Sequence, residues 1–290
     1  MSEKLIIRGR EIKPSDIEQI KAAVERFWDK GRKYISQELC KQWGWYQHNA
    51  ALKEMACREL LLRLERLGYI TLPPRKREID NSKPKTTRLP KNFTLPVLRG
   101  GLKDFGQLAL KMVRTRKEQL LLNGLLGAYH YLGYCHPVGG AVNYLAFLQD
   151  QPIACLSWGS AAWSVKERDQ FIGWSKSARE KNLHSVVNNL RYLILPSVHI
   201  EHLASKLLAI NIRRLSEDWQ ERYGHPLYLL ETFVEEGRFR GTTYKAANWI
   251  EVGKTKGYSK RGRSSFLHGQ IKRIFLYPLH KDFRGFLCHE

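Results

Sequence analysis

The sequence lacks the long apolar segments that a membrane protein needs. No apolar run reaches the roughly 18 residues that span a bilayer as a helix. The first residues also lack the extended apolar core of a signal peptide. We therefore expect a cytoplasmic protein that makes no membrane contact.

Cysteine is scarce and scattered along the chain. The five cysteines include no CxxC pair and no Cys/His cluster that could supply four zinc ligands. Their odd number and wide spacing also argue against a disulfide framework. We expect reduced thiols with a structural role.

Acidic residues are few relative to basic ones. The 28 Asp and Glu residues face 49 Lys and Arg residues, so the net charge is +21 at pH 7. Charge of this size attracts polyanions, and DNA is the partner that it predicts. A hydrophobic fraction of 43% and eight tryptophans indicate a folded protein, and 290 residues allow two domains.

Residues 1–72 have the pattern of a small helical domain. Ser15 and Glu18 have the spacing of a capping box, and apolar residues at helical spacing follow them. Further helices are expected from Ser36 to Trp43 and from about Ala50 to Leu67, followed by a short strand at 69–72. This order predicts a winged helix-turn-helix-like DNA-binding domain, with an unrelated three-helix bundle as the alternative.

In the winged-helix interpretation the third helix enters the major groove of DNA. Polar and basic residues around this helix and beside the wing would then contact DNA: Gln47, Asn49, Lys53, Arg58, Arg75, Lys76 and Arg77.

Residues 73–98 are expected to form a linker. Five of the eleven prolines lie here together with seven Lys or Arg residues, and proline prevents helix continuation. The segment could follow a phosphate backbone or act as a solvated tether.

Residues 99–250 predict an α+β domain, and residues 251–290 a basic C-terminal extension. A mainly helical segment is expected over 102–129, a hairpin from strands 142–148 and 153–158, and two helical regions over 165–171 and 176–181. A strand at 191–195, a long helix over 200–221 and a strand at 227–234 follow.

The segment from Phe239 to Gly257 combines cations, aromatic rings and glycines. Cationic groups beside flat rings suit phosphates and unstacked bases, and glycine lets the backbone approach a ligand closely. The alternative is a helix at about 242–248 followed by a turn and a strand at a domain edge. A second basic run, 257–263, extends the same charge.

Several motifs resemble the family of the Druantia anti-phage protein DruA. They are His130-Tyr-Leu-Gly133, Arg168-Asp169, Ile172-Gly-Trp174, Asn188-Asn189, Leu193-Ile-Leu-Pro196, His202-Leu-Ala-Ser205, Phe239-Arg-Gly-Thr-Thr-Tyr-Lys-Ala-Ala-Asn-Trp249 and Tyr277-Pro-Leu-His-Lys-Asp-Phe283. The resemblance covers nearly the whole chain. It implies an association with phage defence and, for transposase-fused or stand-alone relatives, with mobile elements.

A second resemblance concerns the fold. The order of the expected elements resembles the core of GNAT-type acyltransferases. It consists of a strand, Leu195-Pro-Ser-Val198, a long helix, a second strand and then the segment from Tyr244 to Gly253. In that fold a glycine-rich helix N-terminus binds the pyrophosphate of coenzyme A. The matching segment, 200–206, has no glycine, and Glu201 would place a negative charge beside the anion. The resemblance thus implies a GNAT-like mixed α/β domain and disfavours acyltransferase activity.

Candidate catalytic residues follow from what strand cleavage needs, either metal-binding carboxylates or a nucleophile. They are Glu231, Asp169, Tyr244 and His202, with Mg²⁺ or Mn²⁺ as the metal if one is used. A structural ion pair with an arginine such as Arg191 is the alternative for Glu231, and an Arg168–Asp169 pair is the alternative for Asp169.

Candidate nucleic-acid contacts in the second domain are mainly cations of the 239–257 segment and its surroundings. They are Arg168, Asn188, Asn189, Arg238, Arg240, Lys245, Asn248, Trp249, Lys254, Lys256, Lys260, Arg261 and Arg263. Adjacent asparagines such as Asn188 and Asn189 are more typical of a turn.

The leading functional hypothesis is a DNA-processing protein of mobile-element origin, with transposase-like strand cleavage or transfer on the ends of its own element. The alternative is a non-catalytic DNA-recognition component of an anti-phage defence system that passes DNA to a helicase partner. Duplex and single-stranded DNA both remain candidate ligands, and a homodimer is possible.

Overall fold

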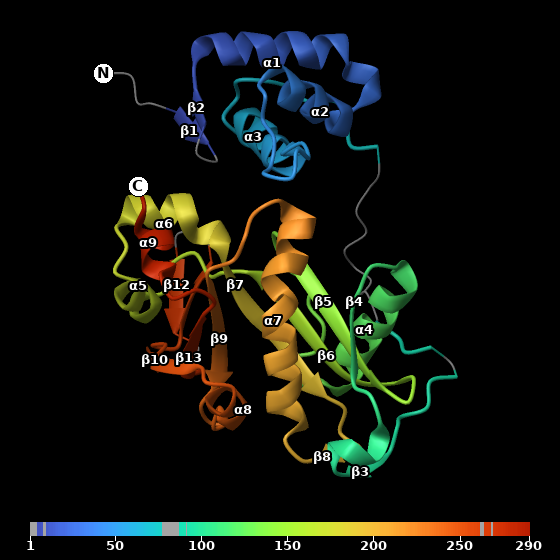
Figure 1. The fold of residues 1–290 in the computed structure, drawn as a ribbon. Coiled ribbons are helices and arrows are strands. Elements are labelled where there is room, and N and C mark those ends of the chain that lie inside the picture. The colour runs from blue at the N-terminus through green and yellow to red at the C-terminus, as the bar shows by residue number, and fades with distance from the viewer. Residues whose placement is uncertain (1–4, 8–9, 77–86, 91, 262–263, 268) are drawn as a thin grey trace. The chain divides into compact units, whose positions relative to one another are not determined.

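The computed structural model describes residues 5–7, 10–76, 87–90, 92–261, 264–267 and 269–290. The chain divides into two compact units, Met1–Lys85 and Thr86–Glu290 (Figure 1). No helix in the described part of the chain combines the length and apolarity needed to span a bilayer. The five cysteines all lie in described ranges and remain thiols.

The first unit is a three-helix core preceded by a small hairpin. Its elements are β1 (Leu5–Ile7), β2 (Arg10–Ile12), α1 (Pro14–Arg26), the 3-10 turn η1 (Trp28–Lys30), α2 (Arg32–Gln42) and α3 (Glu54–Arg66). Ile20, Leu39 and Leu60, one from each α-helix, are completely buried and belong to one core cluster. The expected helical N-terminal region is therefore confirmed.

Local details of this unit differ from the sequence-based expectations. Helix α1 begins at Pro14, and the backbone N–H of Lys13 donates to the carboxylate of Asp16 at 2.9 Å. The cap therefore involves Asp16, while Glu18 forms an ion pair with Lys21. Proline suits this first helical position because its missing N–H would have no partner there.

The strand expected at 69–72 is absent from the described residues. Ile70 and Leu72 instead bury their side chains against the three helices, and the N–H of Leu72 donates to Glu65 at 3.1 Å. The antiparallel pair that the structure describes in this unit, β1–β2, precedes α1. The wing proposed after the third helix is thus not formed by this segment.

The second unit contains a seven-stranded sheet in the order β10-β13-β9-β7-β6-β5-β4. The strands are β4 (Ala109–Met112), β5 (Ala141–Leu148), β6 (Gln151–Ser160), β7 (Val186–Ile194), β9 (Leu229–Glu235), β10 (Ile250–Lys254) and β13 (Lys272–Pro278). All neighbouring strands run antiparallel except β7 and β9, which run parallel. Two small pairs complete the strands, β3 (Leu98–Gly100) with β8 (Val198–Ile200) and β11 (Tyr258–Arg261) with β12 (Ser264–Leu267).

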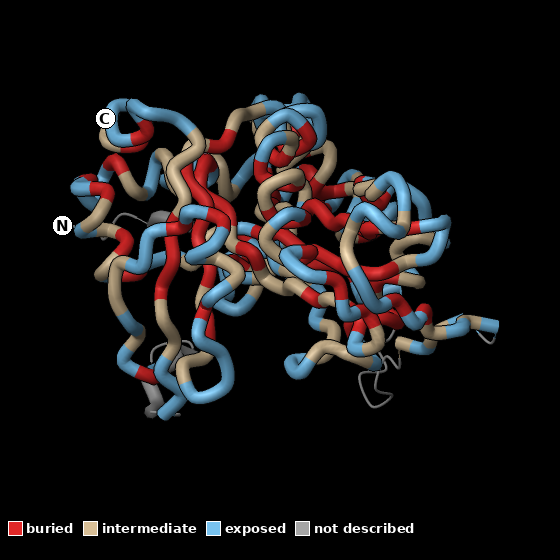
Figure 2. Tube along the Cα trace, turned by 60° about the horizontal axis from the view of Figure 1, so that its bottom comes forward, coloured by how far each residue is buried: buried red, intermediate tan, exposed pale blue. Residues whose placement is uncertain are grey.

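Helices cover both faces of this sheet. They are α4 (Arg116–Tyr129), α5 (Lys166–Ile172), α6 (Lys176–Asn182), α7 (Leu203–Tyr223), α8 (Thr242–Ala246) and α9 (Phe283–Cys288), with 3-10 turns η2 (Leu102–Phe105) and η3 (Leu183–Ser185). Val187 shares a core cluster with α7, whereas Val186 shares one with α5, α6 and α9. Because successive strand residues face opposite sides, α7 and this helix group lie on opposite faces. The buried stretches in Figure 2 follow the strands between them.

Most expected elements of the second unit are confirmed, and so is the α+β class. The turn between β5 and β6 has positive φ at Gln149 and Asp150, as a two-residue hairpin turn requires. The order β7, long helix α7, β9, short helix α8 and β10 is the order that the GNAT resemblance implied.

Three segments differ from expectation. Residues 102–129 are mainly helical as expected, but they also contain β4, which pairs with β5 and forms a sheet edge. Residues 251–290 are not a separate tail, because β13 lies between β9 and β10 within the sheet. Residues 87–98, expected in the linker, contribute Leu89, Phe93 and Leu95 to the core of the second unit.

Candidate functional site

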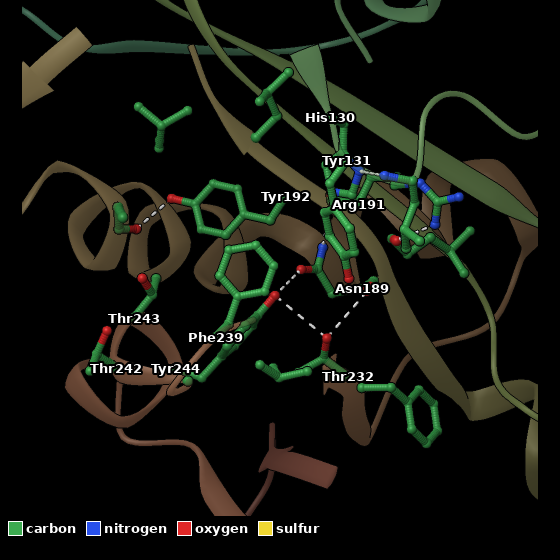
Figure 3. A pocket seen from close by; sticks show the side chains of 18 of the residues that line it. His130, Tyr131, Asn189, Arg191, Tyr192, Thr232, Phe239, Thr242, Thr243 and Tyr244 are labelled. Carbon is green, nitrogen blue, oxygen red and sulfur yellow. Dashed lines mark hydrogen bonds between the residues drawn. The ribbon is translucent and has the colours of Figure 1, made fainter. Parts of the chain in front are cut away.

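The centre of the second unit has a cavity where two neighbouring strands separate. Strands β7 and β9 pair only from Val186 to Asn188 with Leu229 to Glu231. Beyond this point β7 pairs with β6 and β9 pairs with β13. The cavity between them has a volume of about 420 Å³ and is lined by residues 129–132, 189–194, 204, 232–234 and 239–244 (Figure 3).

A β-bulge marks the place where the strands separate. On β7, Asn189 lies opposite Trp158 and Arg191 lies opposite Ser157, so Leu190 is an extra residue in the ladder. A bulge bends its strand and increases the local twist. It therefore helps to turn β7 away from β9 and opens the cavity.

Three polar side chains form the inner wall of the cavity. The hydroxyl of Tyr244 donates to Oδ1 of Asn189 at 2.7 Å, and the Thr232 hydroxyl donates to the backbone carbonyl of Asn189 at 3.3 Å (Figure 3). Burial raises the pKa of Tyr244 to about 12. Tyr244 is thus a neutral hydrogen-bonding group at pH 7, which disfavours its role as a nucleophile.

Close packing behind this wall fixes the position of Tyr244. Gly241 is the N-cap of α8, where φ is +72° and a Cβ would lie 2.5 Å from Cζ of Phe275. Trp249 is buried and stacks on Trp158 with ring centroids 6.3 Å apart. Trp249 is therefore a core residue, contrary to its expected role as a nucleic-acid contact, whereas Asn248 is exposed in the turn after α8.

Exposed aromatic rings lie at the rim of the cavity. Tyr131 and Phe239 are 38% and 44% exposed, and their ring centroids are 5.2 Å apart in an edge-to-face arrangement. The guanidinium of Arg238 lies 4.8 Å from the centroid of the Tyr131 ring. Arg240 lines the cavity, is exposed, and makes no ion pair or hydrogen bond within the described residues.

Two further polar groups of the lining are His130, which follows α4, and Arg191, which lies in β7. Nδ1 of His130 accepts from the backbone N–H of Leu132 at 3.1 Å, so the ring proton belongs on Nε2. Burial, together with the charge of Arg191, lowers the pKa of His130 to about 4. Arg191 donates to the carbonyls of Gly133 and Leu190. His130 is therefore neutral at pH 7.

Two lysines expected to bind nucleic acid are engaged in ion pairs. Lys245 pairs with Glu251 at 3.0 Å, and Lys254 pairs with Glu236 at 2.6 Å. Arg273 contacts both carboxylates and joins them into one network. Lys256 is exposed, the side chains of Lys260 and Arg261 in β11 are not described, and Arg263 lies outside the described residues.

The candidate carboxylates belong to a second network on the opposite face of the sheet. Glu231 and Arg168 are both fully buried and pair at 2.7 Å, and Glu231 also accepts from the N–H of Ala162 at 2.8 Å. Its partner is thus Arg168 and not Arg191. Asp169 pairs with Arg168 and Arg179 and accepts from the Trp174 indole at 3.1 Å.

The four candidate catalytic residues are therefore not brought together. Tyr244 lines the cavity, whereas Glu231 and Asp169 are held by arginines across the sheet. His202 is exposed at the N-cap of α7 with φ of +56°. No group of three His, Cys, Asp or Glu residues that could hold a metal ion occurs within the described ranges.

Asn188 and Asn189 lie within β7 and do not form a turn. Asn189 is part of the inner wall of the cavity, together with Thr232 and Tyr244. Oδ1 of Asn188 is buried without a hydrogen-bond partner in the described residues. Asn188 lies opposite Glu231 in the sheet register, so it belongs to the face that carries the carboxylate network.

A family model described as "Druantia protein DruA" matches residues 63–273. The chain belongs to the DruA family. The match includes the cavity, its rim and both ion-pair networks. The search of curated proteins finds no match.

Among solved structures, this DruA-family chain is similar to acetyltransferases at low identity. Aminoglycoside acetyltransferase AAC(6')-Ib in complex with coenzyme A is 15% identical, with a TM-score of 0.41, and 61% of this chain covers 96% of that one. The ribosomal-protein-S18-alanine N-acetyltransferase from Escherichia coli is 8% identical, with a TM-score of 0.37 and coverages of 60% and 94%. Spermidine/spermine N-acetyltransferase SpeG from Vibrio cholerae is 11% identical, with a TM-score of 0.38 and coverages of 62% and 96%.

The DNA contacts expected in the first unit of this DruA-family chain are only partly on its third helix. Gln47 and Asn49 are exposed in the turn before α3, and the N–H of Gln47 donates to the carbonyl of Ala51 at 2.7 Å. Lys53 is the N-cap of α3, and Arg58 pairs with Glu54 at 3.3 Å. Arg75 and Lys76 are exposed, and Arg77 lies outside the described residues.

Sequence reasoning missed several residues of the site. Tyr131, Thr232 and Phe239 were not singled out as individual contacts, although His130 to Gly133 and the segment from Phe239 appear in the DruA motifs. Their position in those motifs was the available signal, but it does not show that the two segments meet.

We predict that Arg168→Met strongly destabilises the second unit. The change leaves the Glu231 carboxylate buried without its cation, which costs about 3–5 kcal/mol in comparable sites. Burial already raises the pKa of Glu231, and loss of Arg168 raises it further. The Glu231 carboxyl of the folded variant then binds a proton more tightly than the same carboxyl in the unfolded chain. The loss of unfolding free energy relative to wild type should therefore shrink as pH falls from about 7 towards about 4.3.

Urea denaturation at several pH values measures this effect. Arg114→Met is a matched control, because the Arg114–Glu221 pair is largely exposed and its loss should change stability little. Equal effects of the two changes, or a deficit independent of pH, would contradict the assignment of a buried ion pair.

Proposed function

We propose that this DruA-family chain is a DNA-binding component of an anti-phage defence system. The observation that carries the proposal is the rim of the cavity. Exposed Tyr131 and Phe239 offer flat ring surfaces, and Arg238 and Arg240 lie beside them. Rings that stack on bases beside cations that contact phosphates are the usual equipment of single-strand binding sites.

The distribution of charge supports the same proposal. Lys245, Lys254 and Arg273 have carboxylate partners, so their charges are partly neutralised locally. Arg240 has no such partner in the described residues. Arg238 stacks on Tyr131 and makes no described ion pair, so both guanidiniums are available to phosphates. The net charge of +21 adds long-range attraction for DNA.

The arrangement favours recognition over strand cleavage. Glu231 and Asp169 are engaged by arginines, and Tyr244 is a neutral donor to Asn189. Transposase-like cleavage needs converging carboxylates or an activated nucleophile, and the candidate residues do not converge. The helicase partner and the homodimer stay predictions.

We predict that the double change Arg238→Ala and Arg240→Ala weakens binding to single-stranded DNA by roughly tenfold or more, because a hydrogen bond to a charged group contributes about 1.5–3 kcal/mol. The slope of log affinity against log salt should also fall by about 1.5, since two phosphate contacts are lost. Fluorescence anisotropy over a salt series measures both quantities.

The matched control is Arg213→Ala, which removes an exposed cation from α7 outside the cavity lining. It should leave the affinity nearly unchanged apart from a small long-range effect. The proposal is wrong if the purified protein binds no DNA, and the rim is not the contact if the control and the double variant behave alike.

We further expect binding without cleavage. Purified protein incubated with DNA and Mg²⁺ or Mn²⁺ should yield neither shortened strands nor a covalent protein–DNA adduct on denaturing gels. Cleavage that disappears in Tyr244→Phe would instead favour the transposase-like alternative, because that change removes only the hydroxyl.

A further inference from the structure

The cavity extends inward from the aromatic rim and is larger than surface stacking requires. Its volume of about 420 Å³ lies within the range of about 300–1,000 Å³ found for small-molecule sites. Both strands contribute to it, because its lining includes residues 189–194 of β7 and 232–234 of β9. A planar group could therefore enter between the two strands.

The inner wall is equipped with neutral hydrogen-bonding groups. The Tyr244 hydroxyl donates its proton to Asn189. Its oxygen receives a long contact of 3.5 Å from the Thr232 hydroxyl, which leaves it able to accept a shorter hydrogen bond from a ligand. The amide nitrogen of Asn189 makes only long contacts of 3.3 and 3.4 Å to backbone carbonyls. A ligand with both donors and acceptors on one edge could thus find partners here.

The separated strands add backbone groups to this wall. From Asn189 onward, β7 has β6 as its ladder partner, and from Thr232 onward β9 has β13. The strand edges that face each other across the cavity therefore make no ladder with one another. Such edges present both N–H donors and C=O acceptors.

The charged residues that line the cavity are both arginines, Arg191 and Arg240. No carboxylate occurs among the described residues that line the cavity, and His130 lines it in the neutral form. Arg191 is held by two backbone carbonyls, while Arg240 is exposed and unpaired in the described residues. The lining thus suits a ligand with a neutral planar end and an anionic end near Arg240.

We propose that the cavity between β7 and β9 takes up one unstacked nucleobase of a bound DNA strand, with the adjoining phosphate at Arg240. This inference rests on the proposed function and adds entry of a base to surface binding. Asn189 and Tyr244 contact the edge of the base, and Tyr131 and Phe239 stack on its neighbours at the rim. Extracted bases are held in the same general way, by ring stacking and by hydrogen bonds to their edge.

The test compares oligothymidylate with an abasic strand of the same length, which keeps the phosphates and lacks the bases. Wild-type protein should bind oligothymidylate about tenfold or more tightly than the abasic strand, as stacking of a base predicts. Thr243→Trp fills the cavity from α8 and should remove most of this preference while leaving the affinity for the abasic strand unchanged.

Ala246→Trp is the matched control, because it adds the same indole to the same short helix at an exposed position outside the lining. It should retain the full preference for bases. Phe239→Ala separates stacking at the rim from entry of a base into the cavity, because it removes a ring from the rim and leaves the cavity open. It should reduce the preference only in part.

Each outcome has a distinct meaning. If Thr243→Trp keeps the same preference for bases as Ala246→Trp, no base enters the cavity and the inference is overturned, although DNA binding stands. Failure to bind either strand overturns the proposed function itself. Thymidine monophosphate is the probe for a free ligand. It could raise the Tm of wild-type protein but not of Thr243→Trp, while oligothymidylate and the abasic strand bind equally tightly. In that case the cavity binds free nucleotides and does not bind a base of a DNA strand.

Discussion

The separation of β7 from β9 after three paired residues governs the second unit. The last residues of the parallel pairing, Asn188 and Glu231, face one side of the sheet, where Arg168 neutralises the carboxylate. The next residues, Asn189 and Thr232, face the other side. The Thr232 hydroxyl donates to the backbone carbonyl of Asn189, whose side chain accepts from Tyr244. Buried polar groups on both faces thus fix the point at which the strands diverge. A buried carboxylate is costly without a partner, so this point tolerates little change.

Ion pairing separates two kinds of cation in a strongly basic protein. Lys245 of α8, Lys254 of β10 and Arg273 of β13 share the carboxylates of Glu236, which follows β9, and of Glu251 in β10. Each of these cations already faces a carboxylate, so a phosphate would have to compete with that carboxylate for its charge. Arg238 and Arg240 follow β9 on a loop and form no ion pair with a carboxylate of the described residues. Net charge alone therefore describes the attraction of DNA, whereas the location of carboxylates decides where phosphates can be held.

Local patterns predicted much of the fold. Periodic apolar residues located the three helices of the first unit, and the turn at Gln149 and Asp150 located the β5–β6 hairpin. The site was harder to predict, because its parts come from distant segments. The residues near Glu231 in the sequence give no indication that Arg168 is its partner. Trp249 packs on Trp158 in the core, although its neighbours in the sequence have the composition of a surface segment. The basic run before β13 suggested a tail, yet the apolar stretch that follows it fills a gap in the sheet.

The place of β13 has a consequence for how the molecule is made. This strand, residues 272–278, lies between β9 and β10, which are both synthesised before it. On the ribosome, β9 and β10 cannot adopt their final spacing until residues 272–278 have emerged. Phe275, which packs under Tyr244 and Gly241, arrives only then. A chain that ends before residue 272 lacks both the strand between β9 and β10 and the ring on which Tyr244 packs, so the site depends on a strand that is made after every residue of the cavity lining.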